Sequence, residues 1–178
     1  MSMSVESIVI ATDLNKTFKA EQKGLDDVQA LQGINMQIKT GQLTALVGPD
    51  GAGKTTFLRL IAGLYKPTAG SLEVLGMDVA KDPQSVQDRI SYMPQKFGLY
   101  EDLSIQENLD LYADLHGVPM NVRKERFARL LKITDLARFT ERPAGKLSGG
   151  MKQKLGLACT LVRSPELLLL DEPSVGVD

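Results

Sequence analysis

The order of apolar and polar positions in the first half of the chain predicts strands and one helix. Apolar residues alternate with polar ones over 34–38, which is typical of a strand with one buried face. A mostly apolar run over 43–47 ends at Gly48 and predicts a buried strand. Apolar residues then recur at helical spacing over 57–64, so we expect a helix there that ends before Pro67.

The pattern in the second half is mainly helical. Short strands are expected over 71–75 and 90–93. Ser104 and Glu107 have the spacing of a capping box, in which two side chains satisfy backbone N–H groups at the start of a helix. Asn121 is expected to cap a second helix, and apolar spacing over 151–162 predicts a third.

The last apolar run, 167–170, is all leucine and predicts a fully buried strand. Together the elements predict an α/β domain with a mostly helical insert over about residues 104–145.

Composition excludes several classes of protein. The 178 residues include 21 Lys plus Arg and 22 Asp plus Glu, so the net charge is −1 and no basic field is expected to attract nucleic acid. No stretch approaches the roughly 20 apolar residues of a membrane span, and no signal peptide is expected. The single Cys159 excludes an internal disulfide and is expected to be a small buried apolar residue.

A phosphate-binding loop is the first motif that carries chemistry. Residues 48–55 fit the pattern G-x-x-x-x-G-K-[ST], and they lie between a predicted strand and a predicted helix. In this pattern Lys54 supplies charge to the outer phosphates, and the hydroxyl of Thr55 can bind Mg²⁺. The alternative is a glycine-rich turn that binds nothing. The residues expected to contact the nucleotide are Gly48, Asp50, Gly51, Ala52, Gly53, Lys54, Thr55 and Thr56.

Two acids follow the leucine strand. We expect Asp171 to hold Mg²⁺ through water, and Glu172 to act as the general base that polarises the attacking water. The alternative is a strand followed by a solvated acidic turn.

A third motif, Leu147-Ser148-Gly149-Gly150, lies where a helix is expected to begin. Ser148, Gly149 and Gly150 could form a second anion-binding helix end, or Ser148 could be a simple cap.

In this order the three motifs resemble the nucleotide-binding domain of ABC-type ATPases over nearly the whole chain. The resemblance implies a P-loop NTPase fold: a sheet core with an antiparallel β part and a helical insert, forming one nucleotide-binding domain over 1–178. It also implies ATP and Mg²⁺ as ligands. Gln95 matches the family's Q-loop glutamine, which reaches Mg²⁺ and the attacking water. Phe18 matches the aromatic residue that stacks on adenine, although Phe18 could equally be a core residue, and Asp178 matches the acid of the D-loop.

Two stretches, 93–104 and 147–154, resemble the ATPase subunits of bacterial multidrug or antibiotic exporters, some of which carry two such domains in tandem. The chain is most similar to the first domain of such a pair. The resemblance implies that apolar residues of the first stretch grip a membrane permease; the alternative is that they pack the helical insert. These residues are Phe97, Leu99, Tyr100 and Leu103.

The resemblance implies a mechanism and partners. Two domains, from a homodimer or a tandem pair, would close head to tail around ATP and drive a transmembrane permease. The protein would therefore lie in the cytoplasm at the inner face of the membrane. The alternatives are a nucleotide-binding fragment that does not hydrolyse ATP, or a soluble ABC-type ATPase unconnected with transport.

Three departures from the family pattern stand out. Asp50 replaces the usual Asn, and Met151 and Lys152 replace a more usual Gln and Arg. The family's switch histidine lies beyond the acidic turn, and His116 does not match it. We therefore expect the chain to be a truncated piece that lacks the C-terminal strand or strands. The missing strand would lie between the strands predicted over 43–47 and 167–170.

Overall fold

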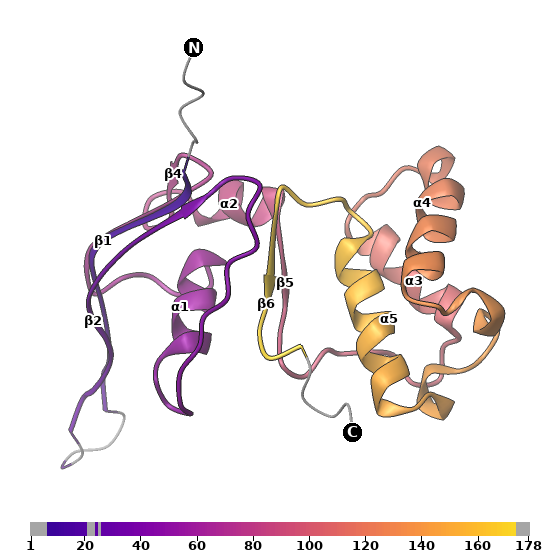
Figure 1. Ribbon diagram of the computed structural model, residues 1–178, viewed down its shortest axis with the longest axis horizontal. Coiled ribbons are helices and arrows are strands. Elements are labelled where there is room, and N and C mark those ends of the chain that lie inside the picture. The colour runs from indigo at the N-terminus through magenta and orange to yellow at the C-terminus, as the bar shows by residue number, and fades with distance from the viewer. Residues whose placement is uncertain (1–6, 21–23, 25, 174–178) are drawn as a thin grey trace. The chain divides into compact units, whose positions relative to one another are not determined.

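The computed structural model describes residues 7–20, 24 and 26–173 (Figure 1). The chain divides into two compact units, Met1–Ile90 and Ser91–Asp178. Asp178, the expected D-loop acid, lies outside the described residues.

The first unit contains a four-stranded sheet in the order β2-β1-β3-β4, with antiparallel pairing throughout. Its strands are β1 (Ser7–Phe18), β2 (Val28–Lys39), β3 (Ala69–Val74) and β4 (Met77–Asp78). The predicted strands over 34–38 and 71–75 are thus confirmed within β2 and β3. The sequence pattern did not reveal β1, because its pairing with both neighbours is irregular around Asp13, whose φ is 44°.

The expected strand over 43–47 is wrong, because residues 42–49 have no regular secondary structure. Leu43 and Val47 are 101% and 95% exposed. Among the described residues of this unit, no strand pairs with the segment. A strand depends on a neighbour for its backbone hydrogen bonds, so an apolar run without one stays irregular.

Two helices complete the first unit. Helix α1 (Lys54–Ile61) buries Phe57, Leu60 and Ile61 but ends three residues before Leu64, which is 52% exposed. The chain leaves the helix at Gly63, whose positive φ of 67° is the usual way in which glycine ends a helix. Helix α2 (Pro83–Arg89), which the sequence analysis did not predict, begins at an Asp82 cap.

The second unit contains a two-stranded sheet of β5 (Ile90–Met93) and β6 (Leu167–Leu170). Both strands were predicted. The expected full burial of β6 is wrong. Leu169 is buried, with 5% of its surface exposed, but the other three leucines are half-buried.

Three helices and two short 3₁₀ turns make up the rest of this unit. They are α3 (Ile105–Leu115), α4 (Met120–Ile133), α5 (Gly149–Leu161) and the turns Ala137–Phe139 and Ala144–Lys146. The predicted capping box at α3 is confirmed: the Glu107 N–H donates to Ser104 Oγ, and the Ser104 N–H donates to Glu107 Oε2. The expected Asn121 cap is wrong, because α4 already begins at Met120, directly after the rigid Pro119.

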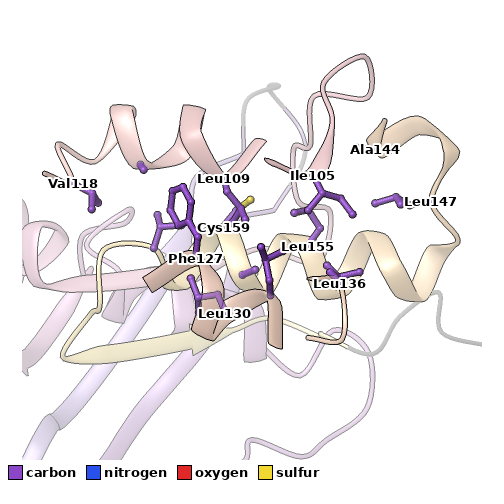
Figure 2. Close-up of a cluster of buried hydrophobic side chains, with 14 residues drawn as sticks. Ile105, Leu109, Val118, Phe127, Leu130, Leu136, Ala144, Leu147, Leu155 and Cys159 are labelled. Carbon is purple, nitrogen blue, oxygen red and sulfur yellow. The ribbon is translucent and has the colours of Figure 1, made fainter. Parts of the chain in front are cut away.

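The core of the second unit lies among these helices (Figure 2). Gly156 in α5 leaves room for the side chains of Met93 and Phe97 to pack against the helix. A Cβ atom there would lie 3.1 Å from the Met93 side chain and 3.2 Å from the Phe97 ring. None of the helices in the described part of the chain is both long and apolar enough to cross a membrane. Side chains labelled in Figure 2 that build this core are Ile105, Leu109, Phe127, Leu130, Leu136, Leu155 and Cys159.

Candidate functional site

The phosphate loop, residues 48–55, leads directly into α1. Gly53 precedes the helix with a φ of 85°, a conformation that L side chains rarely adopt. A Cβ atom at Gly53 would lie 2.6 Å from the Ala30 carbonyl oxygen and 2.7 Å from Leu31 Cδ2. The loop therefore packs against β2 at a distance that only glycine permits. No side chain caps α1, in contrast to the serine caps of α3 and α5.

Lys54 lies across this loop. Its Nζ donates to the carbonyl oxygens of Gly48 and Pro49, both at 2.8 Å. Asp50, Gly51 and Ala52 are exposed, whereas Lys54, Thr55 and Thr56 are half-buried. An ammonium at the positive end of a helix is suited to bind phosphate.

Phe18 lies at the end of β1 and is half-buried, so it is not a fully buried core residue. The Tyr65 ring meets it edge to face, with centroids 5.3 Å apart. Lys16 Nζ lies 4.9 Å from the Phe18 centroid. Phe18 thus belongs to a small aromatic and cationic cluster in the first unit.

Asp171 is held at the end of β6. Its backbone N–H donates to the Met93 carbonyl oxygen at 2.9 Å, and its Oδ2 accepts a hydrogen bond of 2.9 Å from the Tyr92 hydroxyl. The residue is 2% exposed. A buried carboxylate is costly unless it is hydrogen-bonded, and the Tyr92 hydroxyl supplies one such bond.

Glu172 and Gln95 lie together. Gln95 Nε2 donates to Glu172 Oε2 at 2.8 Å. Glu172 has a φ of 49°, which is uncommon for a residue other than glycine. Tyr92 in β5 and Gln95 just after it therefore donate side-chain hydrogen bonds to the two acids that follow β6, Asp171 and Glu172.

Ser148 caps α5, since its Oγ accepts a hydrogen bond of 3.3 Å from the Met151 N–H. Nearby, Lys152 Nζ forms an ion pair with Glu101 Oε1 at 2.6 Å. Next to this pair is a cavity of about 370 Å³. It is lined by Gln95, Lys96, Phe97, Leu99, Glu101, Gly149, Lys152 and Gln153.

The apolar residues after Gln95 differ in how far they are buried. Phe97 and Leu99 pack against the core of the second unit, and the Phe97 ring lies 5.1 Å from that of Tyr112. Tyr100 is 53% exposed, and Leu103 is half-buried. Packing of the insert therefore accounts for Phe97 and Leu99, although both also line the cavity.

The surroundings of Cys159 and His116 shift the pKa values of both side chains. Cys159 is fully buried, as expected, and burial raises the pKa of its thiol, which makes it a poor nucleophile. Burial and the nearby Arg163 lower the pKa of His116.

The sequence did not reveal Tyr92 as the partner of Asp171. Its residue type and its position in β5 do not by themselves predict a contact with an acid. Only the pairing of β5 with β6 places its hydroxyl on Asp171.

Both units contain oxygen donors of the kind that Mg²⁺ prefers. In the first unit Thr55 has a hydroxyl, and in the second unit Gln95 has an amide oxygen and Asp171 a buried carboxylate. The described residues contain no group of three or more His, Cys, Asp or Glu that could hold a metal by itself.

Comparisons with known proteins point to one family. Among curated proteins, the probable multidrug ABC transporter ATP-binding protein YbhF of Escherichia coli (strain K12) is 54% identical over 173 residues. Those residues cover 97% of this chain but only 29% of YbhF. The daunorubicin resistance ATP-binding protein DrrA3 of Streptomyces coeruleorubidus is 37% identical, covering 91% of this chain and 51% of that protein. The chain thus spans less than two thirds of the length of both relatives.

Among solved structures, a dimeric structure of the ATP-binding cassette MJ0796 in a post-hydrolysis state, bound to ADP and Pi, has a TM-score of 0.81. It is 28% identical, and the match covers 96% of this chain and 76% of that one. The predicted P-loop NTPase fold of ABC ATPases is therefore confirmed. The model of the ABC transporter family matches residues 31–175, and the chain accordingly belongs to the ABC transporter family.

Proposed function

We propose that this chain binds ATP with Mg²⁺ and hydrolyses it to power a membrane exporter. The observation that carries the hydrolysis is the hydrogen bond between Gln95 and Glu172, because it fixes a carboxylate suited to act as a base at the end of β6.

ATP binding is assigned to the phosphate loop. Lys54 would exchange its two loop carbonyls for the outer phosphates, while Gly51 and Gly53 let the backbone approach them. Phe18 would stack against adenine, beside the cationic Lys16. Asp50 is exposed, so its carboxylate can stay in water instead of facing the phosphates.

Mg²⁺ would be held by Thr55, Gln95 and Asp171. When bound, it would neutralise charge on the transferred phosphoryl group. Asp171 is suited to this task because it is buried and its position is fixed by the Met93 carbonyl and the Tyr92 hydroxyl.

In the hydrolytic step, Glu172 would accept a proton from the attacking water. The water oxygen forms a bond to the γ-phosphorus as the bond to the bridging oxygen breaks, giving ADP and phosphate. Gln95 would hold Glu172 in position for this proton transfer.

The proposed partners are a second nucleotide-binding domain, from another copy or a tandem domain, and a transmembrane permease. A dimer would place the Ser148-Gly149-Gly150 end of α5 on the ATP of the opposite domain, with Asp178 nearby as the D-loop acid. Exposure of Ser148 and Gly149 is compatible with such a contact. The permease would meet the surface at the 370 Å³ cavity, which Leu99 lines, and at the exposed Tyr100 that follows Leu99 in the chain. These partners would place the protein at the inner face of the membrane.

Two other functions were open from the sequence. The first is a domain that binds ATP without hydrolysing it. Such a domain would not need a general base, whereas here the Gln95 amide fixes the position of the Glu172 carboxylate. A soluble ABC-type ATPase would share the chemistry but not the permease, and the similarity to the drug resistance proteins favours the exporter.

Glu172→Gln tests the hydrolysis. In the protein as its gene encodes it, we expect ATP binding to be retained and turnover to fall by at least about a hundredfold, because an amide cannot accept the proton. Glu166→Gln is the matched control, since it makes the same change at the exposed residue just before β6 and should keep turnover. Unchanged turnover in Glu172→Gln would remove the proposed role of Glu172.

A further inference from the structure

The segment Tyr92–Gln95 faces both acids that follow β6. Tyr92 donates to Asp171 and Gln95 donates to Glu172, at 2.9 Å and 2.8 Å. Gln95 has a role in the proposed reaction, but nothing so far requires a hydroxyl at position 92.

The hydroxyl of Tyr92 must be the donor in its bond to Asp171. An ionised carboxylate only accepts hydrogen bonds, and the Tyr92 hydroxyl points its proton at one defined atom, Oδ2. The backbone of Asp171 is fixed separately, by its N–H bond of 2.9 Å to the Met93 carbonyl. One bond therefore fixes the backbone of the metal-binding acid, and the other fixes the rotation of its carboxylate.

This second bond bears on metal binding. A carboxylate that binds an ion must present a lone pair in one direction, and outer partners that orient the ligand are part of the site's affinity. Asp171 is 2% exposed, so water cannot easily replace a lost hydroxyl. Tyr92 is half-buried and lies in β5, the strand that pairs with β6.

From these contacts we infer that Tyr92 is a positioning residue for Mg²⁺: its hydroxyl orients the Asp171 carboxylate and so sets the affinity for the ion. The inference rests on the proposed function, because it takes Asp171 as a ligand of the ion or of the water bound to it. It predicts a defect that appears only when the metal is present.

Tyr92→Phe is the test, since it removes the hydroxyl and keeps the ring. The matched control is Tyr112→Phe, which removes another tyrosine hydroxyl of the same unit, one that donates to the Gly98 carbonyl at 2.6 Å. The measurement uses the protein as its gene encodes it, with a non-hydrolysable ATP analogue. Mn²⁺ binding is followed by electron paramagnetic resonance, and nucleotide affinity is measured separately in EDTA.

We expect Tyr92→Phe to bind Mn²⁺ about tenfold more weakly, the size typical of losing an outer partner of a metal ligand. Nucleotide affinity in EDTA should stay unchanged, which also shows that the variant is folded. Tyr112→Phe should match the wild type in both measurements. In an Asp171→Asn background the Tyr92→Phe change should have no further effect, because Tyr92 acts through Asp171.

Two results would overturn the inference: wild-type Mn²⁺ affinity in Tyr92→Phe, or an equal loss in the Asp171→Asn background. Failure of the proposed function has a different signature. In that case the wild type itself would bind no nucleotide-dependent Mn²⁺, or Asp171→Asn would bind it as tightly as the wild type.

Discussion

Two short apolar runs, 43–47 and 167–170, look alike in the sequence but differ in the structure. Each runs into residues suited to nucleotide chemistry, the phosphate loop in one case and Asp171 in the other. The second run forms β6 beside β5, and the Asp171 N–H extends the pairing to the Met93 carbonyl. The first run forms no strand, and its Leu43 is fully exposed. Apolar character thus predicts the need for a partner strand, and the partner decides whether a strand forms.

The same contrast separates the two kinds of candidate site. The acids after β6 take their positions from a neighbouring strand, through Tyr92 and Gln95. The phosphate loop takes its shape within the first unit instead. Gly53 packs tightly against β2, and Lys54 donates hydrogen bonds to two carbonyl oxygens of the loop itself.

Leu169→Ala and Leu43→Ala test the contrast directly. Leu169 is buried, so its truncation should lower the free energy of unfolding by about 3 kcal/mol. Leu43 is fully exposed, so the same change should alter it by less than about 0.5 kcal/mol. Urea unfolding followed by far-ultraviolet circular dichroism measures both. A loss at Leu43 equal to that at Leu169 would mean that the 43–47 run is buried against a partner after all.

Lys54→Ala tests whether the loop is shaped for phosphate. It removes the charge that would meet the outer phosphates, so we expect ATP affinity to fall by about a hundredfold. Titration with a fluorescent ATP analogue measures this loss. The control is Lys66→Ala, which removes an exposed lysine of the same unit and should bind ATP as the wild type does. Equal affinity in Lys54→Ala and the wild type would exclude the assigned role.

Sequence reasoning succeeded where the signal is local. The alternation over 34–38, the spacing of Ser104 and Glu107, and the four leucines of β6 all identified real elements. It failed where the hydrogen-bond partners of a side chain lie outside the repeating pattern. Asn108 is one example: its fully buried amide donates to the carbonyl oxygens of Tyr100, Leu103 and Ser104, and no periodicity predicts this. Tyr92 is the other, because only strand pairing gives it a partner.

Gly53→Ala and Gly51→Ala sharpen the comparison at the level of the loop. Both glycines have positive φ, 85° and 77°, so a side chain is strained at each. Only at Gly53 would the new Cβ also meet backbone, at 2.6 Å from the Ala30 carbonyl oxygen. We expect Gly51→Ala to cost about 1 kcal/mol of folding stability and Gly53→Ala about 2 kcal/mol or more. Thermal unfolding measures the two variants. Equal costs would mean that the loop moves away from β2 without penalty.

The smallest expected effect is at the start of α3. There the side chains of Ser104 and Glu107 cap the helix, whereas α1 has no side-chain cap. Ser104→Ala should lower the free energy of unfolding by about 1 kcal/mol at neutral pH.

The Ser104 backbone N–H and then its hydroxyl lower the pKa of Glu107 below its usual 4.5. The stabilisation by ionised Glu107 is therefore complete above pH 4.5 and is lost as the pH falls through the lower folded pKa. Glu107→Gln should accordingly approach wild-type stability in acid. A gap between Glu107→Gln and the wild type that stays constant down to the acid limit would mean that the capping box owes nothing to the charge of Glu107.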